Sequence, residues 1–401
     1  MKVLIVNKFL YPNGGSETYI FELGKQLEKM GHEVQFFGMQ DDRNIVGNHV
    51  NAYTKNMQFH GNKISKLVYP IKIIYSAEAR KKIRNVLEDF KPDVVHLNNF
   101  NFQLTPSIIY EVKKHRIPIV FTAHDYQLVC PNHMCLDVLS RKVCQDCIDH
   151  GYAQCMKKKC IHGSKLKSIL GTVEAVLYQK LHTYRYIDAV ICPSEFMEEK
   201  LDTNPDLMGK TITMHNFISV SGESEQAFEK KQKDPYVVYF GRYEYEKGVH
   251  TLLEVCKALP EVSFRFAGRG PLKEQIDQLP NAKDCGFIKT EQVKELVSNA
   301  LFAVCPSEWY ENCPFSIMEA MTYGTPVIGS RIGGIPELIR EHQDGLLYES
   351  GNAKELKEKI SLLWNDRSMC QSYSEQCRYV QYDTVETYVE KLIEIYQLNR
   401  K

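Results

Sequence analysis

Short apolar runs recur along the whole chain, and each is followed by a segment with helical spacing of its apolar residues. The runs are rich in Val, Ile and Phe and show no polar alternation, which is typical of parallel strands covered on both faces. This alternation of strand and helix predicts an α/β architecture of doubly wound parallel sheets. The expected strands are residues 3–6, 34–37, 94–97, 119–122, 189–192, 237–240, 264–267, 302–305 and 327–329.

One sheet would not hold all of these strands, so the 401 residues are expected to form two domains. The polar stretch 219–235 separates two halves that each open with a strand, a glycine-containing turn and a helix. We expect an N-terminal domain over 1–215, a C-terminal domain over 216–380, and a C-terminal helix over 381–401 that packs back on the first domain. Two such domains would enclose a cleft at the carboxyl ends of their strands.

Charge is balanced overall but unevenly distributed. Residues 1–200 carry 27 Lys and Arg against 20 Asp and Glu, whereas residues 201–401 carry 23 against 30. The basic first half favours an anionic surface or substrate. No run approaches the ~18 apolar residues that span a bilayer, and the apolar start is too short for a signal peptide. We therefore expect a cytoplasmic protein with reduced cysteines.

Glycine-containing turns follow the first strand of each half. Gly14 and Gly15 precede Ser16, a predicted helix cap, and this turn suits a phosphate or a sugar hydroxyl, with a plain strand-to-helix turn as the alternative. In the second half, Arg242 and Lys247 flank the turn. A guanidinium, an ammonium and a helix N-terminus together suit a diphosphate, with a solvated charged loop as the alternative. No G-x-G-x-x-G is present, so a nicotinamide site is unsupported.

Two glutamates, Glu311 and Glu319, are separated by seven residues. We predict a helix capped by Ser316, which places Glu319 in the first turn and Glu311 on the preceding loop. A carboxylate accepts hydrogen bonds from two neighbouring hydroxyl groups, so each glutamate suits a sugar or a ribose, with two surface glutamates as the alternative. The apolar neighbours of Glu319 indicate a buried helix start, where a lone carboxylate is unfavourable without a partner.

In this order, the motifs of the second half resemble a known family. They are Gly241-Arg242, Lys247-Gly248, Ala267-Gly268-Arg269-Gly270-Pro271, Cys305-Pro306-Ser307, Glu311 with Glu319-Ala320, Gly324-Thr325-Pro326-Val327 and Gly333-Gly334-Ile335-Pro336-Glu337. With Gly14-Gly15-Ser16-Glu17 and His124-Asp125 in the first half, they resemble glycosyltransferase family 4. These are retaining, nucleotide-sugar-dependent enzymes of the GT-B fold, in which two Rossmann-like domains face each other across a cleft.

The resemblance implies roles for individual residues. Arg242 and Lys247 would neutralise the donor diphosphate, Glu319 would hold the ribose, and Glu311 would hold the transferred sugar. His124 would face the sugar and the acceptor, and the departing phosphate oxygen would take the acceptor proton, so no enzyme base is assigned. The catalytic candidates are His124, Glu311, Arg242 and Lys247. The donor-binding candidates are Gly14, Gly15, Gly241, Arg242, Lys247, Gly268, Gly286, Ile288, Glu311, Phe315, Ser316 and Glu319.

One position departs from the family pattern. Many relatives have glycines in the loop after the first glutamate, whereas Pro314 has no N–H group here, so Phe315 and Ser316 would supply the backbone donors. The chain also lacks an Asp-x-Asp sequence, the usual sign of a metal-bound donor. We therefore expect transfer without a catalytic metal or cofactor.

Six of the 13 cysteines fall between residues 130 and 160. They are paired at two- and four-residue separations, which suits a structural zinc site, while an iron–sulfur cluster, disulfides and free thiols remain alternatives. We predict that zinc stabilises this insertion, residues 130–164, beside His124. The candidate ligands are Cys130, Cys135, Cys144, Cys147, Cys155 and Cys160.

Two basic segments of the first half alternate with apolar residues. One covers residues 63–84 and the other residues 157–177. Such segments suit an anionic membrane surface, and packed helices with solvated lysines are the alternative. We expect peripheral contact at the inner face of the cell membrane. Nucleic-acid binding is not expected, because no recognisable module is present.

These expectations combine into one function. We predict a retaining transfer from a nucleotide-diphosphate sugar to an acceptor hydroxyl, on a lipid-linked oligosaccharide of capsule, O-antigen or exopolysaccharide synthesis. A nucleotide-sugar epimerase of the same fold is one alternative. A non-catalytic scaffold that binds a sugar or a metal is the other.

Overall fold

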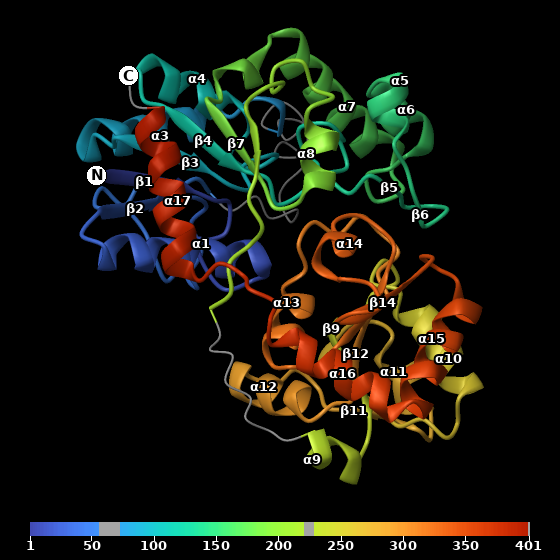
Figure 1. The fold of residues 1–401 in the computed structure, drawn as a ribbon. Helices are drawn as coiled ribbons and strands as arrows, with labels where there is room; N and C mark the ends of the chain where they lie inside the picture. Colours follow the sequence, from blue (N-terminus) through green and yellow to red (C-terminus); the bar gives the residue numbers. More distant parts are fainter. Residues whose placement is uncertain (56–72, 220–227, 400–401) are drawn as a thin grey trace. The chain divides into compact units, whose positions relative to one another are not determined.

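The computed structural model describes residues 1–55, 73–219 and 228–399. The chain forms two compact units, drawn as a ribbon in Figure 1. Unit 1 contains residues 1–140, 144–217 and 383–401, and unit 2 contains residues 141–143 and 218–382. The chain therefore leaves unit 1 after Phe217 and returns to it at Asp383.

Unit 1 is built on a parallel sheet of six strands. In chain order these are β1 (Lys2–Val6), β2 (Glu33–Phe37), β3 (Val94–Leu97), β4 (Ile119–Thr122), β7 (Ala189–Cys192) and β8 (Thr211–Thr213). Their order in the sheet is β2-β1-β3-β4-β7-β8, so the order reverses between β1 and β3. Ligands of open α/β sheets bind outside the carboxyl ends of the strands at such a reversal. The short strands β5 (Leu136–Asp137) and β6 (Lys142–Val143) form a separate pair.

The helices of unit 1 include one from the C-terminus of the chain. They are α1 (Gly15–Lys29), α3 (Ala77–Phe90), α4 (Ser107–Lys114), α5 (Asp146–His150), α6 (Ala153–Lys158), α7 (Lys165–Lys180), α8 (Glu195–Leu201) and α17 (Val385–Leu398), with the 3-10 helix η1 (Thr183–Tyr186). Helix α17 lies against α1 (Figure 1). Its residue Tyr388 is fully buried in the core of unit 1. The hydroxyl groups of Tyr19 and Tyr388 are 3.0 Å apart.

Unit 2 has a second parallel sheet, in the order β11-β10-β9-β12-β13-β14. The strands are β9 (Val237–Arg242), β10 (Phe264–Arg269), β11 (Ala282–Asp284), β12 (Phe302–Cys305), β13 (Val327–Ser330) and β14 (Gly345–Tyr348). The helices are α9 (Phe228–Lys233), α10 (Val249–Ala258), α11 (Lys273–Asp277), α12 (Thr290–Ser298), α13 (Phe315–Thr322), α14 (Ile335–Leu338), α15 (Ala353–Asn365) and α16 (Arg367–Cys377).

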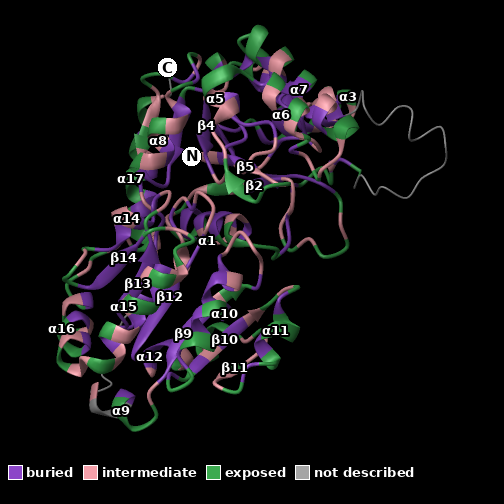
Figure 2. Ribbon diagram, turned by 90° about the vertical axis from the view of Figure 1, so that its right-hand side faces the viewer, coloured by how far each residue is buried: buried purple, intermediate pink, exposed green. Residues whose placement is uncertain are grey.

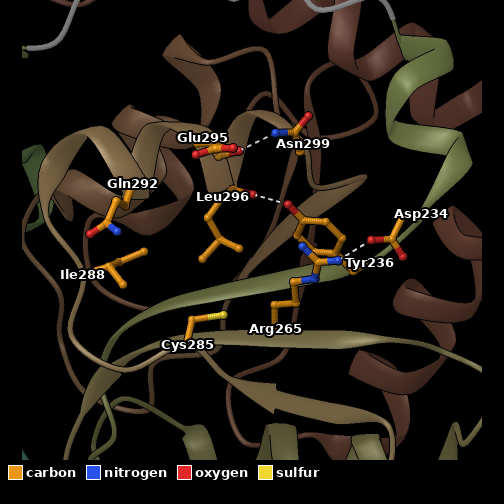
Figure 3. A pocket seen from close by; sticks show the side chains of 9 residues that line it. All are labelled: Asp234, Tyr236, Arg265, Cys285, Ile288, Gln292, Glu295, Leu296 and Asn299. Atoms are coloured by element: carbon orange, nitrogen blue, oxygen red, sulfur yellow. Dashed lines mark hydrogen bonds and ion pairs between the residues drawn. The ribbon is translucent and has the colours of Figure 1, made fainter.

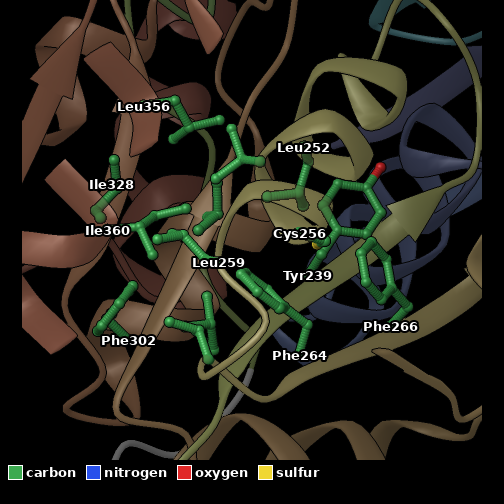
Figure 4. Packing of buried hydrophobic residues seen from close by; sticks show 14 of the residues in the cluster. Tyr239, Leu252, Cys256, Leu259, Phe264, Phe266, Phe302, Ile328, Leu356 and Ile360 are labelled. Atoms are coloured by element: carbon green, nitrogen blue, oxygen red, sulfur yellow. The ribbon is translucent and has the colours of Figure 1, made fainter. Parts of the chain in front are cut away.

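Both faces of the unit 2 sheet are covered, as the apolar runs predict. Figure 4 shows one core, in which Phe264 and Phe302 from the strands pack with Leu252 of α10 and Ile360 of α15. A second core contains Val238 and residues of α13 and α14. Strands β12, β13 and β14 are buried along their whole length, whereas β9 and β10 are buried over half of their residues and the edge strand β11 is not buried (Figure 2).

The predicted strands are all present, but some elements differ from expectation. The boundary between units falls between Phe217 and Ile218, just before the polar stretch 219–235, and the described part of that stretch contains α9. The prediction that Ser16 and Ser316 cap helices is wrong, because the caps are Gly14 and Pro314. The Ser16 hydroxyl donates instead to the buried Glu17 carboxylate at 3.0 Å. Glu319 is the fifth residue of α13 and therefore lies beyond its first turn.

Candidate active site

The carboxyl edge of the unit 2 sheet is formed by tightly packed glycine turns. Gly241 and Gly268 are paired at the ends of β9 and β10. Gly268 has φ 155°, and a Cβ atom there would lie 1.9 Å from the carbonyl oxygen of Gly241. No residue with a side chain fits this position without moving backbone, so the two turns leave the sheet side by side.

A third glycine, Gly248, fixes the start of α10. It has φ 66°, and a Cβ atom would lie 1.7 Å from the carbonyl oxygen of Pro306. The turn after β9 therefore lies directly against the segment after β12. Because Lys247 precedes Gly248, its side chain reaches the residues of that second segment.

Lys247 and Glu311 form a mostly buried ion pair at this edge. Lys247 Nζ lies 2.6 Å from Glu311 Oε1, which also accepts a hydrogen bond from Ser307 Oγ at 2.6 Å. Burial alone would raise the pKa of Glu311, but the charge and hydrogen bond of Lys247 and the hydrogen bond of Ser307 hold it below its usual value. Glu311 is therefore ionised. An ammonium has three donors, so Lys247 retains hydrogen-bonding capacity for a ligand.

The backbone of Glu311 is fixed by the turn after β13. Gly334 N donates to the Glu311 carbonyl oxygen at 2.7 Å. Gly333 has φ 57°, and a Cβ atom there would lie 2.3 Å from the same oxygen. The Gly-Gly pair thus allows close contact with the loop that carries Glu311.

Glu319 has a different environment from Glu311. It lies on α13 next to the buried Met318 and Ala320. Burial raises the pKa of Glu319 to about 7, and in the described part of the chain it forms no ion pair. Near pH 7 this carboxyl group is about half ionised and has no charged partner among the described residues, so it is able to accept hydrogen bonds from the hydroxyl groups of a ligand.

The structure does not join Arg242 to this cluster. Its side chain is 55% exposed, and its guanidinium lies 3.5 Å from the Glu246 carboxylate. Gly286 is held next to the Gly268 turn, because its carbonyl oxygen accepts from Gly268 N at 2.8 Å. Phe287 is 75% exposed, and the Arg269 guanidinium lies 5.0 Å from its ring centroid. Arg242 and this aromatic residue are both accessible at the surface of unit 2.

Phe315 and Ser316 are the first two residues of α13. The first N–H groups of a helix have no partner within it. The two residues therefore offer backbone donors, as the sequence predicts from Pro314.

A cavity of about 400 Å³ lies between α12 and the sheet. Figure 3 shows Tyr236, Arg265 and Asp234 on one side and Leu296 on the other. Tyr236 precedes β9 and Arg265 is the second residue of β10, so this wall is at the amino-terminal ends of these strands. Of the predicted donor-binding residues, Ile288 lines it, whereas Lys247, Glu311 and Glu319 do not.

In unit 1, the Gly14 turn is supported by a buried polar cluster. Asn7 Nδ2 donates to Glu17 Oε1 at 3.0 Å, and Asn99 Nδ2 donates to Ser16 Oγ at 2.9 Å. Gly15 begins α1 directly after Gly14. The turn after β1 is therefore held by residues from the turn after β3.

His124 follows β4 in the same unit. Its Nε2 lies 2.9 Å from Asn98 Oδ1, and its ring lies edge-on to Tyr19 at 5.0 Å. Burial lowers the pKa of His124 to about 4, against the opposing effect of Asp125. The Asp125 carboxylate lies 3.5 Å from His133 Nδ1. His124 is a neutral imidazole near pH 7.

Sequence reasoning missed several residues of these clusters. Ser307 belongs to the Cys305-Pro306-Ser307 motif, but only the structure shows that its hydroxyl group donates a hydrogen bond to the Glu311 carboxylate. Asn98 and Asn7 follow the strands β3 and β1, and their position after buried apolar runs is the signal that would have found them.

The six clustered cysteines all line one small cavity of unit 1, with Asn132, Leu136, Gln145 and Ile148. The Cys130 thiol donates a hydrogen bond to Asn132 Oδ1 at 2.9 Å. As the side chains stand, no three His, Cys, Asp or Glu residues of the described chain are arranged to hold a metal ion. Zinc binding therefore stays a prediction.

Part of the first basic segment lies outside the described residues, namely Lys63, Lys66 and Lys72. Of the remainder, Arg80 and Arg84 bind the buried Glu111 of α4 at 2.8 and 2.6 Å. These two arginines hold α3 and α4 together. No helix of the described chain has the length and apolar character needed to cross a membrane.

Two family models together match most of the chain. Glycosyltransferase Family 4 matches residues 13–221, and Glycosyl transferases group 1 matches residues 220–379. The chain belongs to glycosyltransferase family 4 and is a glycosyltransferase.

Individual relatives are distant. Sulfoquinovosyl transferase SQD2 of Arabidopsis thaliana is 36% identical over 140 residues, which is 33% of this chain and 27% of the plant enzyme. An uncharacterized 42.6 kDa protein in the cps region of Klebsiella pneumoniae is 23% identical over 358 residues, covering 85% of this chain and 88% of that protein.

Solved structures show the fold. HepE of Anabaena in complex with UDP has a TM-score of 0.70 at 17% identity, covering 99% of this chain and 100% of that one. WaaG, a glycosyltransferase involved in lipopolysaccharide biosynthesis, has a TM-score of 0.67 at 15% identity, covering 98% and 99%. The fold is GT-B, with two Rossmann-like domains.

Proposed function

We propose that this glycosyltransferase moves a sugar from a nucleotide-diphosphate sugar to an acceptor hydroxyl, with retention of the anomeric configuration. The observation that carries the proposal is the Lys247–Glu311 pair at 2.6 Å, at the carboxyl edge of the unit 2 sheet. A diphosphate placed there meets an ammonium that is already oriented, and the exposed Arg242 adds a second cation. UDP in the structure of Anabaena HepE supports a donor of this chemical class.

The two glutamates suit two different sugars. Glu311 is ionised and fixed by Ser307 and the Gly333 turn, so it accepts hydrogen bonds from the transferred sugar. Glu319 accepts hydrogen bonds from the ribose. The backbone donors of Phe315 and Ser316 contact the sugar or the phosphate between them.

The proposed chemistry uses the leaving group as the base. The bond from the anomeric carbon to the phosphate oxygen breaks, a bond to the acceptor oxygen forms on the same face, and the acceptor proton passes to the departing phosphate. Lys247 and Arg242 stabilise the charge that develops on this phosphate. His124 is neutral and acts by hydrogen bonding to the sugar rather than as a cationic acid. No step requires a metal ion.

The acceptor is proposed to be a lipid-linked oligosaccharide of cell-surface polysaccharide synthesis. The Klebsiella pneumoniae relative in a cps region and the lipopolysaccharide enzyme WaaG support this setting.

The test is a donor screen with product analysis. Nucleoside diphosphate release is measured for UDP-, GDP-, ADP- and CDP-sugars, with and without a pool of polyprenyl-linked glycans, and products are identified by mass and by the NMR coupling of the new anomeric proton. The proposal predicts acceptor-dependent release and a retained anomer. An inverted anomer would overturn retention, and a rearranged sugar without an acceptor would favour an epimerase.

A further inference from the structure

Helix α7 (Lys165–Lys180) of unit 1 is oriented with its apolar side outward. Its buried residues are Ser168, Gly171, Thr172, Glu174, Ala175 and Tyr178, which are small or polar apart from the tyrosine. Its large aliphatic residues are exposed instead: Leu166 by 65%, Val173 by 46% and Leu177 by 37%. Leu181, the residue after the helix, is 52% exposed. This is the reverse of the usual arrangement for a helix on the surface of a soluble domain.

The exposed apolar residues form one continuous stripe. Leu166, Val173, Leu177 and Leu181 follow each other at separations of seven and four residues, which places them on one face of a helix. Half-buried aliphatic residues flank the stripe at positions 169, 170 and 176. We call the stripe and these neighbours the α7 face.

Specific bonds prevent α7 from rotating to bury this face. Ser168 Oγ accepts from Ile161 N at 3.0 Å, and Tyr178 OH donates to the carbonyl oxygen of Ile74 at 2.6 Å. A Cβ atom on Gly171 would lie 2.3 Å from the Ile161 side chain. The buried side of α7 is thus matched to its neighbours, and the α7 face stays in contact with solvent.

Cations predominate in and next to α7. Between residues 157 and 185 the chain has seven Lys and Arg residues and one acidic residue, Glu174, whose side chain is buried. Burial raises the pKa of Glu174 to about 8, so it adds little negative charge near pH 7. Lys165, Lys167 and Lys180 are exposed on α7 itself.

We propose that the α7 face docks on the surface of an anionic lipid bilayer, with the aliphatic side chains in the interface and the lysines on the lipid phosphates. Aliphatic residues bordered by cations of one sign are the pattern of interfacial helices. A protein partner fits less well, because lysine is depleted at protein–protein interfaces. A nucleic acid would contact the lysines but would leave the aliphatic residues without an apolar partner. The proposal goes beyond the transfer reaction and does not depend on it.

The test is flotation of the full-length protein with vesicles of phosphatidylcholine alone and of phosphatidylcholine with phosphatidylglycerol. The proposal predicts flotation with the second composition, weakened by added salt. Leu166→Ser combined with Leu177→Ser, and separately Lys165→Glu combined with Lys167→Glu, should each reduce the floating fraction at least tenfold. The matched controls are Leu362→Ser and Lys354→Glu combined with Lys357→Glu on the exposed side of α15 in unit 2, which should float as the unaltered protein does.

Circular dichroism and donor-nucleotide binding of each variant distinguish lost docking from lost folding and from failure of the proposed transfer reaction. Equal flotation with both vesicle compositions, or unchanged flotation of folded α7 variants, would overturn the proposal. The unaltered protein could instead be a dimer that floats with neither vesicle composition. If the Leu166→Ser, Leu177→Ser variant is then a monomer, the α7 face binds a second copy of the chain and not a bilayer.

Discussion

Lys247 and Glu311 are joined by a 2.6 Å ion pair although 64 residues separate them in sequence. The pair exists because Gly248 allows the turn after β9 to contact the segment after β12. Glu319 shares the motif with Glu311 but forms no ion pair among the described residues. This difference between the two glutamates leads to separate predictions for them.

Lys247→Met should lower turnover by ~10² or more, since it removes charge that acts on the leaving diphosphate. It should also reduce the free energy of unfolding by about 3–5 kcal/mol, because the buried Glu311 loses its partner. Kinetics and urea denaturation measure the two effects. Arg331→Met is the control: the side chain of Arg331 is 43% exposed and those of its partners Glu341 and Glu349 are 28% and 66% exposed, so the expected loss is about 0–1 kcal/mol with normal turnover.

Binding of the donor should release a proton near pH 7. The pKa of Glu319 is raised to about 7 in the free protein, and hydrogen bonds from ribose hydroxyls favour the ionised form and lower it. Titration calorimetry in buffers of different ionisation enthalpy measures this release, with a nucleotide-sugar that itself does not titrate in this range. Glu319→Gln should abolish the release and weaken binding. Equal proton release by the variant would show that another group titrates.

Gly248→Ala should disrupt the donor site by more than the strain of an alanine at a positive φ would. The methyl group would meet the Pro306 carbonyl, so the two segments must separate and Lys247 must move from Glu311. Gly209→Ala is the matched control, because it has a similar φ of 74° and open space around it, and it should cost about 1–2 kcal/mol. We expect nucleotide affinity to fall for Gly248→Ala and to stay normal for Gly209→Ala.

Unit 1 should lose stability in mild acid. Burial lowers the pKa of His96 to about 3 and that of His124 to about 4, from 6.5 in an exposed histidine. The unfolded chain binds these protons first as the pH falls, so stability is present above pH 6.5 and declines below it. Each group contributes up to about 1.4 kcal/mol per pH unit. His96→Gln should flatten the profile from urea denaturation, whereas the exposed His162→Gln should leave it unchanged.

The cysteine cavity should hold zinc. We predict about one zinc ion per chain in protein purified without a metal-binding tag, measured by elemental analysis. Chelation should lower the melting temperature, because the ion would connect residues between Cys130 and Cys160. A metal content far below one equivalent, together with unchanged melting after chelation, would leave the cluster as free thiols.

The βαβ order was predictable because buried parallel strands leave continuous apolar runs, and the nine expected strands are present. The short strands β8, β11 and β14 were missed, since three or four residues carry little pattern of their own. The motif residues were also predictable, but their contacts were not: the sequence does not show that Ser307 donates a hydrogen bond to Glu311 or that Asn98 contacts His124. Such contacts depend on how turns from different strands meet.

The orientation of α7 shows the same limit. Its apolar spacing predicts a helix but does not show which side is buried. The bonds of Ser168 and Tyr178 and the close contact at Gly171 decide this. The sequence alone therefore left a packed helix and a lipid-binding helix as alternatives.

The most direct test of the donor site is a crystal structure of the protein with the nucleoside diphosphate that binds it most tightly. The account predicts the diphosphate at Lys247 and the ribose hydroxyls on Glu319. A nucleotide bound instead in the cavity beneath α12, with Lys247 still bonded to Glu311 alone, would contradict it.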